Sequence, residues 1–339
     1  MREFIETVIQ GKNLSSIQAK SAFKAIMDGD ATVPQVAAFI VALRMKGESV
    51  EEITAAAEVM REKVTKILPD KETCLVDTCG TGGDGSNTFN ISTAAAVVAA
   101  GAGAVVAKHG NRSVSSKSGA ADVLEALGVN IMIDPSQMKT CLDQAGIGFL
   151  FAPTLHKAMK HAAPARKEIG VRTIFNLLGP ITNPAFAKRQ LLGVFSPHLT
   201  EPMANVLKNM GSVRVFVVHG CNSMDEVSLS GPTQVSELNN GHVTTYNVVP
   251  EQYGLKRAPI ETLQGGTPPT NAAIIKDLLN GVKGAPRDVV ILNAAFALCA
   301  AGLCDKPEDG IKLAKRSIDS GAASQKLALL IQITNDLRK

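Results

Sequence analysis

The spacing of apolar residues changes near Pro69, and this change limits the possible folds more than any other feature. Before Pro69, in stretches such as 35–46, apolar residues recur every three or four positions, which is the helical period. After it, short apolar runs alternate with helical stretches such as 135–145 and 200–210. Strands that alternate with helices indicate a largely parallel sheet with crossover connections. We predict strands of this sheet at 74–77, 104–108, 130–133, 148–152, 190–195 and 213–220.

Helix-start signals divide the N-terminal part into separate helices. Ser49 and Glu52 have the spacing of a capping box, and a helical run follows them. Thr32 and Pro34 open another helix, which Gly47 ends. No strand pattern appears in this part of the sequence, so it is predicted to be helical throughout.

The whole pattern predicts an α/β protein with two domains. Residues 1–70 are predicted to form a small all-helical domain, and residues 71–339 a larger α/β domain with a mostly parallel central sheet. Asn240-Gly241 lies between alternating polar and apolar residues, which indicates a hairpin. From Asn271 onward, helices are predicted to dominate again.

Charge and composition argue against two classes of protein. The net charge is +4, from 35 basic and 31 acidic residues, which is well short of a nucleic-acid-binding surplus. The apolar tract 94–107 contains glycines and is too short to cross a bilayer. The first residues, MREFIETVIQGK, carry early acidic side chains and lack the apolar region of a signal peptide. We therefore expect a cytoplasmic protein that binds neither nucleic acid nor membranes. Its six cysteines form no CxxC pair and are expected to be inert reduced thiols.

A glycine-rich loop follows the first predicted strand. The segment GTGGDG at 80–85 has four glycines in six residues, and Asn90, Ser92 and Thr93 precede a clear helix. Glycines let backbone amides approach a ligand, and a helix N-terminus favours an anion. The loop lacks the Gly-Lys-Ser/Thr of a Walker motif and the third glycine of a dinucleotide fingerprint. Asp84 would repel a phosphate, which points to a sugar hydroxyl or a cation nearby. A flexible turn with an ordinary helix cap is the alternative.

A second polar loop follows the next predicted strand. Residues 108–118 hold three cationic side chains and four serines. Ligands of parallel sheets bind beyond the carboxyl ends of the strands, so the two loops are expected to face one crevice. A solvated basic loop is the alternative, but the density of hydroxyl groups after a buried strand favours phosphate.

These motifs, in this order, resemble the anthranilate phosphoribosyltransferase family. The resemblance is carried by GTGGD, NIST and KHGNRSVSSKSG, by the run 156–185, and by MDEVS at 224–228. It implies a fold like that of nucleoside phosphorylases, with a segment near 166–188 packed on the helical domain, and a homodimer formed through the helical part. The implied reaction is a step of tryptophan synthesis. It transfers the phosphoribosyl group of 5-phosphoribosyl 1-diphosphate to anthranilate, with Mg²⁺, and releases pyrophosphate.

The resemblance also implies three sets of site residues. The phosphoribosyl diphosphate site comprises Gly80, Gly83, Asp84, Thr88, Asn90, Ile91, Ser92, Thr93, Lys108, His109, Gly110, Asn111, Arg112, Ser113, Val114, Ser115, Ser116 and Ala120. Serine is frequent in the family where this chain has Ala120, so that contact is expected through the backbone. The anthranilate site comprises Gly80, Asn111 and Arg166, and the magnesium site Ser92, Asp225 and Glu226.

The chemistry of the residues supports these roles. Mg²⁺ prefers oxygen ligands, commonly one or two carboxylates with substrate phosphates, and Asp225-Glu226 follows a predicted strand. Alone, that pair would be interpreted as a solvated turn. Lys108 and the loop amides are expected to stabilise the leaving pyrophosphate. Arg166 and Asn111 are expected to place the acceptor, so we predict these two and Lys108 as catalytic residues. His109 is either a proton acceptor or a structural residue.

Two other functions remain open from the sequence. A pyrimidine nucleoside phosphorylase of the same fold would use phosphate and a nucleoside, and would carry different residues where KHGNRSVSSKSG stands. A non-catalytic relative that binds nucleic acid would have a strongly basic surface and would lack the metal acids. Asp225, Glu226 and the mild net charge argue against the second possibility.

Overall fold

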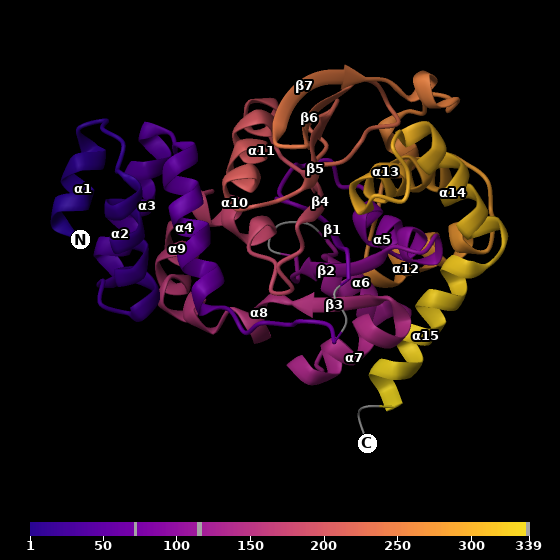
Figure 1. Ribbon diagram of the computed structural model, residues 1–339, viewed down its shortest axis with the longest axis horizontal. Helices are drawn as coiled ribbons and strands as arrows, with labels where there is room; N and C mark the ends of the chain where they lie inside the picture. The colour runs from indigo at the N-terminus through magenta and orange to yellow at the C-terminus, as the bar shows by residue number, and fades with distance from the viewer. Residues whose placement is uncertain (71–72, 114–116, 337–339) are drawn as a thin grey trace.

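The computed structural model describes residues 1–70, 73–113 and 117–336. Helices fill one end of the molecule, and a sheet with flanking helices fills the other (Figure 1). The helical end begins with α1 (Arg2–Ile9), α2 (Ser16–Asp28), α3 (Val33–Lys46) and α4 (Val50–Lys63).

The predicted helix starts of the N-terminal part are confirmed. Ser49 caps α4 and forms the capping box with Glu52. Glu52 is fully buried, and its carboxylate also accepts from the backbone N–H of Leu14 at 2.9 Å and pairs with Lys46 at 2.9 Å. This one acid therefore joins the start of α4 to the end of α3 and to the turn before α2.

The sheet has seven strands in the order β3-β2-β1-β4-β5-β6-β7. The first five in this order are parallel, and β6 and β7 are antiparallel. The predicted hairpin is confirmed as β6–β7, where Asn240 and Gly241 have φ angles of 50° and 78°. The strands are β1 (Leu75–Gly80), β2 (Val105–Gly110), β3 (Ile147–Phe151), β4 (Arg189–Gly193), β5 (Arg214–Gly220), β6 (Thr233–Asn239) and β7 (His242–Val248).

One predicted strand, at 130–133, is wrong. This segment joins no sheet, although Ile131 and Ile133 are buried in the core. Its polar groups bond elsewhere: the backbone N–H and the side-chain amide of Asn130 donate to Thr334, both at 3.2 Å. A short apolar run before a helix buries its side chains without pairing its backbone, and periodicity alone does not separate the two cases.

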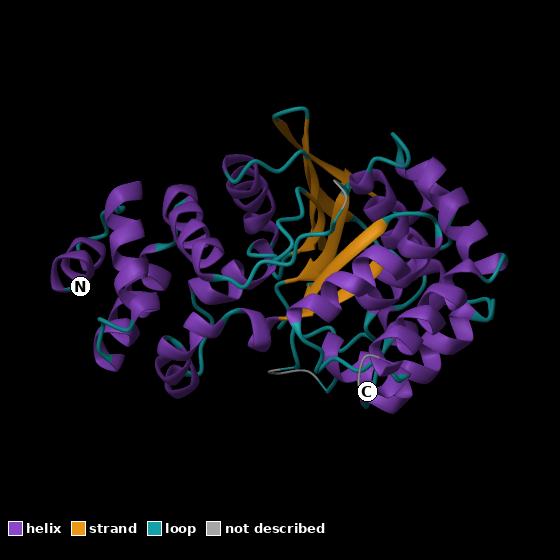
Figure 2. Ribbon diagram, turned by 60° about the horizontal axis from the view of Figure 1, so that its bottom comes forward, coloured by secondary structure: helices purple, strands orange, loops and turns teal. Residues whose placement is uncertain are grey.

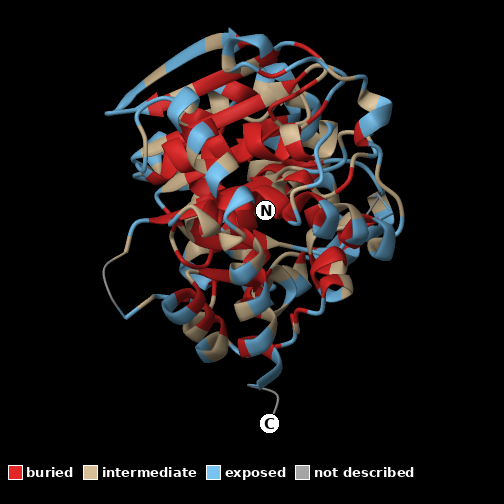
Figure 3. Cartoon of the chain, turned by 90° about the vertical axis from the view of Figure 1, so that its right-hand side faces the viewer, coloured by how far each residue is buried: buried red, intermediate tan, exposed pale blue. Residues whose placement is uncertain are grey.

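Helices cover both faces of the sheet (Figure 2). Alternate residues of β5 enter two different cores: Phe216 and Val218 pack with α5 and α13, while Val215 and Val217 pack with α11 and the N-terminal helices. The strands and inner helices are therefore buried and the outer helices half-exposed (Figure 3). The α-helices after β1 are α5 (Ile91–Gly101), α6 (Ala120–Leu127), α7 (Pro135–Ala145), α8 (Ala152–Leu155), α9 (Ala163–Ile169), α10 (Ile174–Ile181), α11 (Thr200–Asn209), α12 (Pro268–Leu279), α13 (Ala285–Ala301), α14 (Pro307–Asp319) and α15 (Ala322–Asp336).

Four short 3₁₀ helices complete the described elements: η1 (Lys157–His161), η2 (Pro197–Leu199), η3 (Pro250–Tyr253) and η4 (Ile260–Leu263). The helical C-terminal part predicted from Asn271 onward is confirmed as α12 to α15. Among the described helices, none combines the length and apolar character needed to span a membrane.

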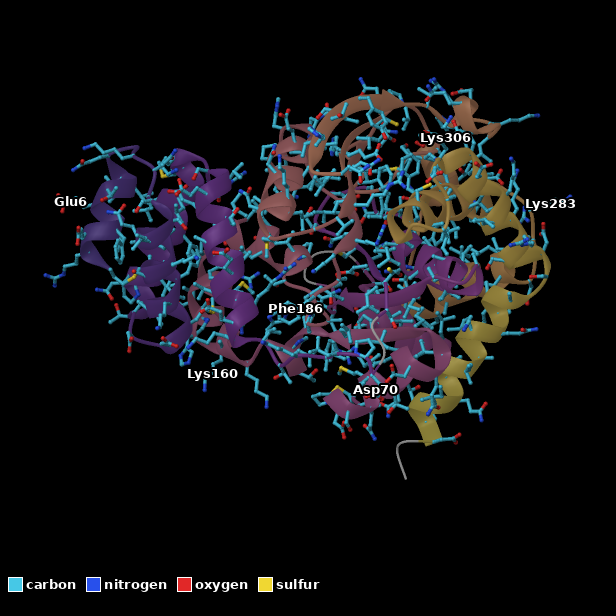
Figure 4. The ribbon with its side chains drawn as sticks, in the orientation of Figure 1. Glu6, Asp70, Lys160, Phe186, Lys283 and Lys306 are labelled. Carbon is cyan, nitrogen blue, oxygen red and sulfur yellow. The ribbon has the colours of Figure 1, made fainter. Side chains whose placement is uncertain are left out.

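The chain returns from the sheet to the helical end through α9 and α10. Phe175 of α10 packs edge-on against Phe23 of α2, with ring centroids 6.1 Å apart. Arg61 of α4 donates to the carbonyl of Ile181 at 2.9 and 3.1 Å. Phe186 lies where the two ends of the molecule meet (Figure 4), and Arg61 stands over its ring at 5.8 Å. This return places residues 156–172 between the helical end and the carboxyl ends of the strands.

The order in which the chain adds strands to the sheet reverses at β1. The chain builds β1, β2 and β3 outward on one side and then β4 and β5 on the other. Ligands of such sheets bind outside the carboxyl ends of the strands at this reversal. Gly80 and Gly193 are paired across β1 and β4 at that edge, so the candidate site is sought there.

Candidate active site

Two strand-end glycines admit the acidic loop to the edge of the sheet. A side chain at Gly80 would clash with the Asp225 carboxylate, and one at Gly193 would clash with the backbone of Asp225. The backbone N–H of Gly82 donates to Asp225 Oδ2 at 2.8 Å. The glycine loop and the loop after β5, distant in sequence, therefore meet at the reversal point, and glycine is required there for space.

Glu226 reaches the start of α5. Its Oε1 accepts from the backbone N–H of Ser92 at 3.1 Å. A free amide at a helix N-terminus favours negative charge. Thr78 also binds this helix start, because its hydroxyl donates to the carbonyl of Ser92 at 3.2 Å. The predicted magnesium residues Ser92, Asp225 and Glu226 are thus brought together.

Lys108 lies beneath this group. Its side chain, near the end of β2, is almost fully buried, and Nζ donates to the carbonyl of Thr78 at 2.6 Å. The hydroxyl of Ser92 is 3.5 Å from the same Nζ. The pKa of Lys108 is lowered by burial. The nearby acids Asp77, Glu226 and Asp225 offset only part of this effect. One ammonium group therefore lies close to several carboxyl groups.

Burial raises the pKa values of both acids of the predicted magnesium site. The pKa of Asp225 rises to about 7, because burial is reinforced by the nearby Asp84 carboxylate. The pKa of Glu226 is raised well above its ordinary value by burial and by Asp225. Crowded, half-buried carboxylates that share one lysine have the donor chemistry of a hard dication site. The residues present fit Mg²⁺, which would offset their mutual repulsion.

Asp84 belongs to the same acidic group. Its Oδ1 accepts from the backbone N–H of Ser86 at 3.1 Å, and its Oδ2 accepts from the backbone N–H of Asp225 at 3.3 Å. The unusual acid of the glycine loop therefore faces the predicted cation site.

Asn90 connects the two polar loops. Its Oδ1 accepts from the Ser118 hydroxyl at 3.1 Å and from Asn271 Nδ2 at 2.9 Å, and its own amide donates to the Ser118 carbonyl at 3.0 Å. The side chain of Asn90 thus joins the start of α5, the basic loop and α12. The expectation that the two loops face one crevice agrees with these contacts.

The basic loop leads into α6 at Gly119. A side chain at Gly119 would clash with the backbone of Ser113, and Ala120 is the first residue of the helix. The Asn111 side chain is exposed and accepts from the backbone N–H of Arg112 at 2.7 Å. Gly110 ends β2 against the Phe149 ring. The predicted site residues Val114, Ser115 and Ser116 lie outside the described residues.

Arg112 is paired with acids of α6 in this structure. Its guanidinium lies 2.9 Å from Asp122 and 2.5 Å from Glu125. The backbone N–H of Ser113 also donates to Asp122, at 3.1 Å. The structure therefore leaves the predicted role of Arg112 toward the diphosphate as a proposal that requires these ion pairs to open.

The other predicted diphosphate residues differ in exposure. Thr88 forms an isolated bridge with Gln264, while Ile91 is buried at the start of α5. Thr93 is also buried, and its hydroxyl has no hydrogen-bond partner among the described groups. Gly83 is exposed with a φ of 67°, and its carbonyl accepts a hydrogen bond from Arg172.

His109 forms a buried pair with His156. Their Nε2 atoms are 3.2 Å apart, and burial lowers the pKa values to about 3 for His109 and about 4 for His156. Both rings are therefore neutral near pH 7. The backbone N–H of His109 donates to the buried Asp77, which Asn183 also contacts at 2.7 Å. His109 therefore links β2 to the segment that carries Arg166, one of the residues predicted to bind the acceptor.

Arg166 lies in α9, and the residues His156 and Arg172, before and after it in the chain, each contact the predicted phosphoribosyl diphosphate site. His156 precedes it and contacts His109, while Arg172 follows it and donates to the carbonyl of Gly83. The Arg166 guanidinium lies over the Phe175 ring at 5.2 Å, and burial lowers its pKa. Among the described residues it has no acidic partner within ion-pair distance. A half-buried guanidinium of this kind is suited to an incoming carboxylate.

Several polar side chains that hold the site were not predicted from the sequence. Asn293, fully buried in α13, accepts from the backbone N–H of Val227 and donates to its carbonyl, both at 2.9 Å, and so fixes the residue after Glu226. Asn271, Asn183 and Arg172 act similarly on other segments. A lone polar residue inside an apolar helix is a usable signal, because buried amides are bonded.

Two family profiles match the chain. "Glycosyl transferase family, helical bundle domain" matches residues 2–64, and "Glycosyl transferase family, a/b domain" matches residues 72–324. Together with the parallel sheet and the polar loops at its reversal point, they define the class as glycosyl transferases with a helical bundle and an α/β domain.

Individual relatives narrow this class. The anthranilate phosphoribosyltransferase of Acetivibrio thermocellus is 56% identical over 99% of this chain and 97% of its own length. That of Symbiobacterium thermophilum is 54% identical over 100% of this chain and 99% of its own. The chain belongs to the anthranilate phosphoribosyltransferase family.

Solved structures of this family have the same fold. The Thermus thermophilus enzyme matches with a TM-score of 0.92 and 43% identity, over 98% of this chain and 99% of the other. The Saccharomyces cerevisiae enzyme, in complex with PRPP and Mg, matches with a TM-score of 0.89 and 30% identity, over 98% and 97%. The expected fold, a helical bundle with a mostly parallel α/β domain, is confirmed.

Proposed function

We propose that this protein transfers the phosphoribosyl group of 5-phosphoribosyl 1-diphosphate to anthranilate, giving N-(5-phosphoribosyl)anthranilate and pyrophosphate in tryptophan biosynthesis. The observation that carries the proposal is the meeting of the glycine loop, the acidic loop and Lys108 at the reversal point of the sheet. Open amides, a cation site and a buried ammonium are what a sugar diphosphate requires.

The donor side binds and polarises the leaving group. Ser92, Asp225 and Glu226 would hold Mg²⁺, which supplies charge neutralisation for the pyrophosphate when bound. The backbone amides at 80–83 and the start of α5 donate to phosphate oxygens. The ammonium group of Lys108, which is almost fully buried, stabilises the developing negative charge. Cleavage of the ribose C1–O bond is thereby favoured without a protein nucleophile.

The acceptor side places anthranilate. Arg166 binds the carboxylate through a charge-assisted hydrogen bond, and Asn111 contacts the substrate near the ribose. The amine is then held in line with C1 as the C1–O bond breaks. The remaining site residues proposed above, including Thr88, Arg112 and Ala120, surround the phosphoribosyl diphosphate.

Assembly and location follow from the same family membership as proposals. We infer that the protein works as a homodimer joined through its helical end, in the cytoplasm. Residues 1–70 would then form the dimerising domain and residues 71–339 the catalytic one.

The assay follows the fluorescence of anthranilate as it is consumed. Full activity is expected with 5-phosphoribosyl 1-diphosphate and Mg²⁺, and none when either the donor or the metal is omitted. Consumption of a pyrimidine nucleoside with inorganic phosphate, and none of anthranilate, would contradict the proposal and establish the phosphorylase alternative.

A further inference from the structure

Two cysteines outside the transfer site lie together at the end of α13. Cys299 is in the last turn of α13 and Cys304 is in the loop before α14, and their Sγ atoms are 3.0 Å apart. Gly302, between them, has φ 81° and turns the chain back toward the helix. A disulfide has an S–S length of about 2.05 Å, so the two sulfur atoms need to approach by only about 1 Å.

The two thiols have different environments. Cys299 is buried, whereas Cys304 is half-buried and reachable from solvent. The hydrogen bond from Cys299 lowers the pKa of Cys304, and Arg214 adds to this, against the acids Asp305 and Asp309. The same hydrogen bond and burial raise the pKa of Cys299.

Arg214 is held beside this pair by several contacts. It donates to the carbonyl of Asp305 at 2.6 Å and to that of Cys304 at 3.4 Å, and it pairs with Glu237 at 3.4 Å. The guanidinium is therefore a fixed positive charge at the loop that carries Cys304. An accessible thiol beside a cation and next to a second, buried thiol is the arrangement of a reactive and a resolving cysteine.

We propose that Cys299 and Cys304 form a reversible disulfide when the protein meets a peroxide, at a modification site separate from the transfer site. The Cys304 thiolate attacks one peroxide oxygen, the O–O bond breaks, and the departing hydroxide takes a proton and leaves as water. The Cys299 sulfur then attacks the sulfenic sulfur of Cys304. The hydroxyl group leaves with the Cys299 proton as a second water. Both sulfurs are oxidised, the peroxide is reduced, and a dithiol reverses the change.

The other cysteines provide the comparison. Cys74 is exposed, Cys79 and Cys141 are buried, and Cys221 is half-buried beside the Ser228 hydroxyl at 3.1 Å. Within the described part of the chain, no other two thiols are in contact. Cys74 is thus an exposed thiol without a resolving partner, and it serves as the matched control.

The test uses the reduced full-length chain, treated with hydrogen peroxide, alkylated and digested for peptide mass spectrometry. We expect the peptide that contains Cys299 and Cys304 to lose two hydrogens and both alkylation sites, and to regain them after dithiothreitol. The Cys299→Ser variant is expected to leave Cys304 as a sulfenic acid that dimedone traps. The Cys74→Ser variant should give the same disulfide as wild type.

Two results would overturn the proposal. One is a wild-type peptide in which both cysteines remain alkylated while Cys74 is oxidised. The other is irreversible oxidation of Cys304 to the sulfinic acid while Cys299 stays a free thiol. Both are read from the unaltered chain, so neither depends on the folding of a variant.

Discussion

Arg166 is the single residue whose predicted effect is most specific to one substrate. Its guanidinium packs on Phe175 at 5.2 Å between two contacts with the donor side. Loss of a hydrogen bond to a charged group costs about 1.5–3 kcal/mol, which is roughly a tenfold to hundredfold change in binding. We expect Arg166→Ala to raise the KM for anthranilate by that factor and to leave the KM for the ribosyl donor nearly unchanged.

Steady-state kinetics with each substrate varied in turn check this prediction. Lys167→Ala, an exposed neighbour on the same helix, is the control and should keep both KM values. Equal increases in both KM values for Arg166→Ala would show a general disturbance of the site. An unchanged anthranilate KM would remove the assigned role.

The buried histidine pair predicts how stability depends on pH. Burial lowers the pKa values of His109 and His156 to about 3 and about 4, while an unfolded histidine has a pKa of about 6.5. Below about pH 6.5 the unfolded state binds protons that the folded state does not, so stability falls as the pH falls. Each histidine contributes up to about 1.4 kcal/mol per pH unit in this window.

Urea unfolding at a series of pH values from 7 down to about 5 measures this effect. The His156→Gln variant is expected to lose stability less steeply than wild type as the pH falls. His242→Gln, on the exposed edge strand β7, should leave the slope unchanged. A slope for His156→Gln equal to that of wild type would contradict the neutral buried pair.

The sequence identified many of the residues of the candidate site but not their supports. The sequence motifs that contain Gly80, Lys108 and Asp225 indicate the chemistry of each residue without knowledge of the fold. Asn293 and Asn183 have no such motif, because their roles depend on backbone groups far away along the chain. A single sequence does not show which distant segments meet, so these contacts appear only in three dimensions.

At the scale of elements, α13 holds the acidic loop. Asn293 makes hydrogen bonds to the N–H and C=O of Val227 and to the carbonyl of Val289, all at 2.9 Å. Asn293→Ala removes these partners from the buried N–H and C=O of Val227, which is expected to cost roughly 2–4 kcal/mol of stability. It should also raise the Mg²⁺ concentration needed for half-maximal activity, because Glu226 is no longer fixed.

Thermal unfolding and a magnesium titration of activity separate the two effects. Asn205→Ala, on α11, removes one exposed amide contact and should change neither. Loss of stability with an unaltered magnesium requirement would mean that Asn293 supports the core without positioning the acids.

Some helices, turns and strands can be predicted from the sequence and others cannot. Capping residues such as Ser49 and the Asn240-Gly241 turn act locally, and the structure confirms them. The segment 130–133 is a short apolar run, which predicts a strand, but it pairs with none of the described strands, and Asn130 bonds to α15. Burial is encoded locally, whereas strand pairing depends on a neighbour elsewhere in the chain.

At the scale of the whole molecule, the strand order explains why the site forms. The order in which the strands are added reverses at β1, and the carboxyl ends of β1 and β4 are paired there, at Gly80 and Gly193. The segment that returns to the helical end carries Arg166 between His156 and Arg172, which contact the end of β2 and the glycine loop. The proposed donor and acceptor residues are therefore carried by different parts of the chain, the strand ends and the segment that returns to the helical end.

The central claim is that Asp225 and Glu226 join the ribosyl donor to the protein through Mg²⁺. Calorimetric titration of 5-phosphoribosyl 1-diphosphate, with Mg²⁺ and with a chelator, tests it directly on wild type and on Asp225→Asn with Glu226→Gln. We predict that Mg²⁺ tightens binding to wild type by about tenfold or more and does not tighten binding to the double variant. An equal gain in affinity from Mg²⁺ in both proteins would contradict the account.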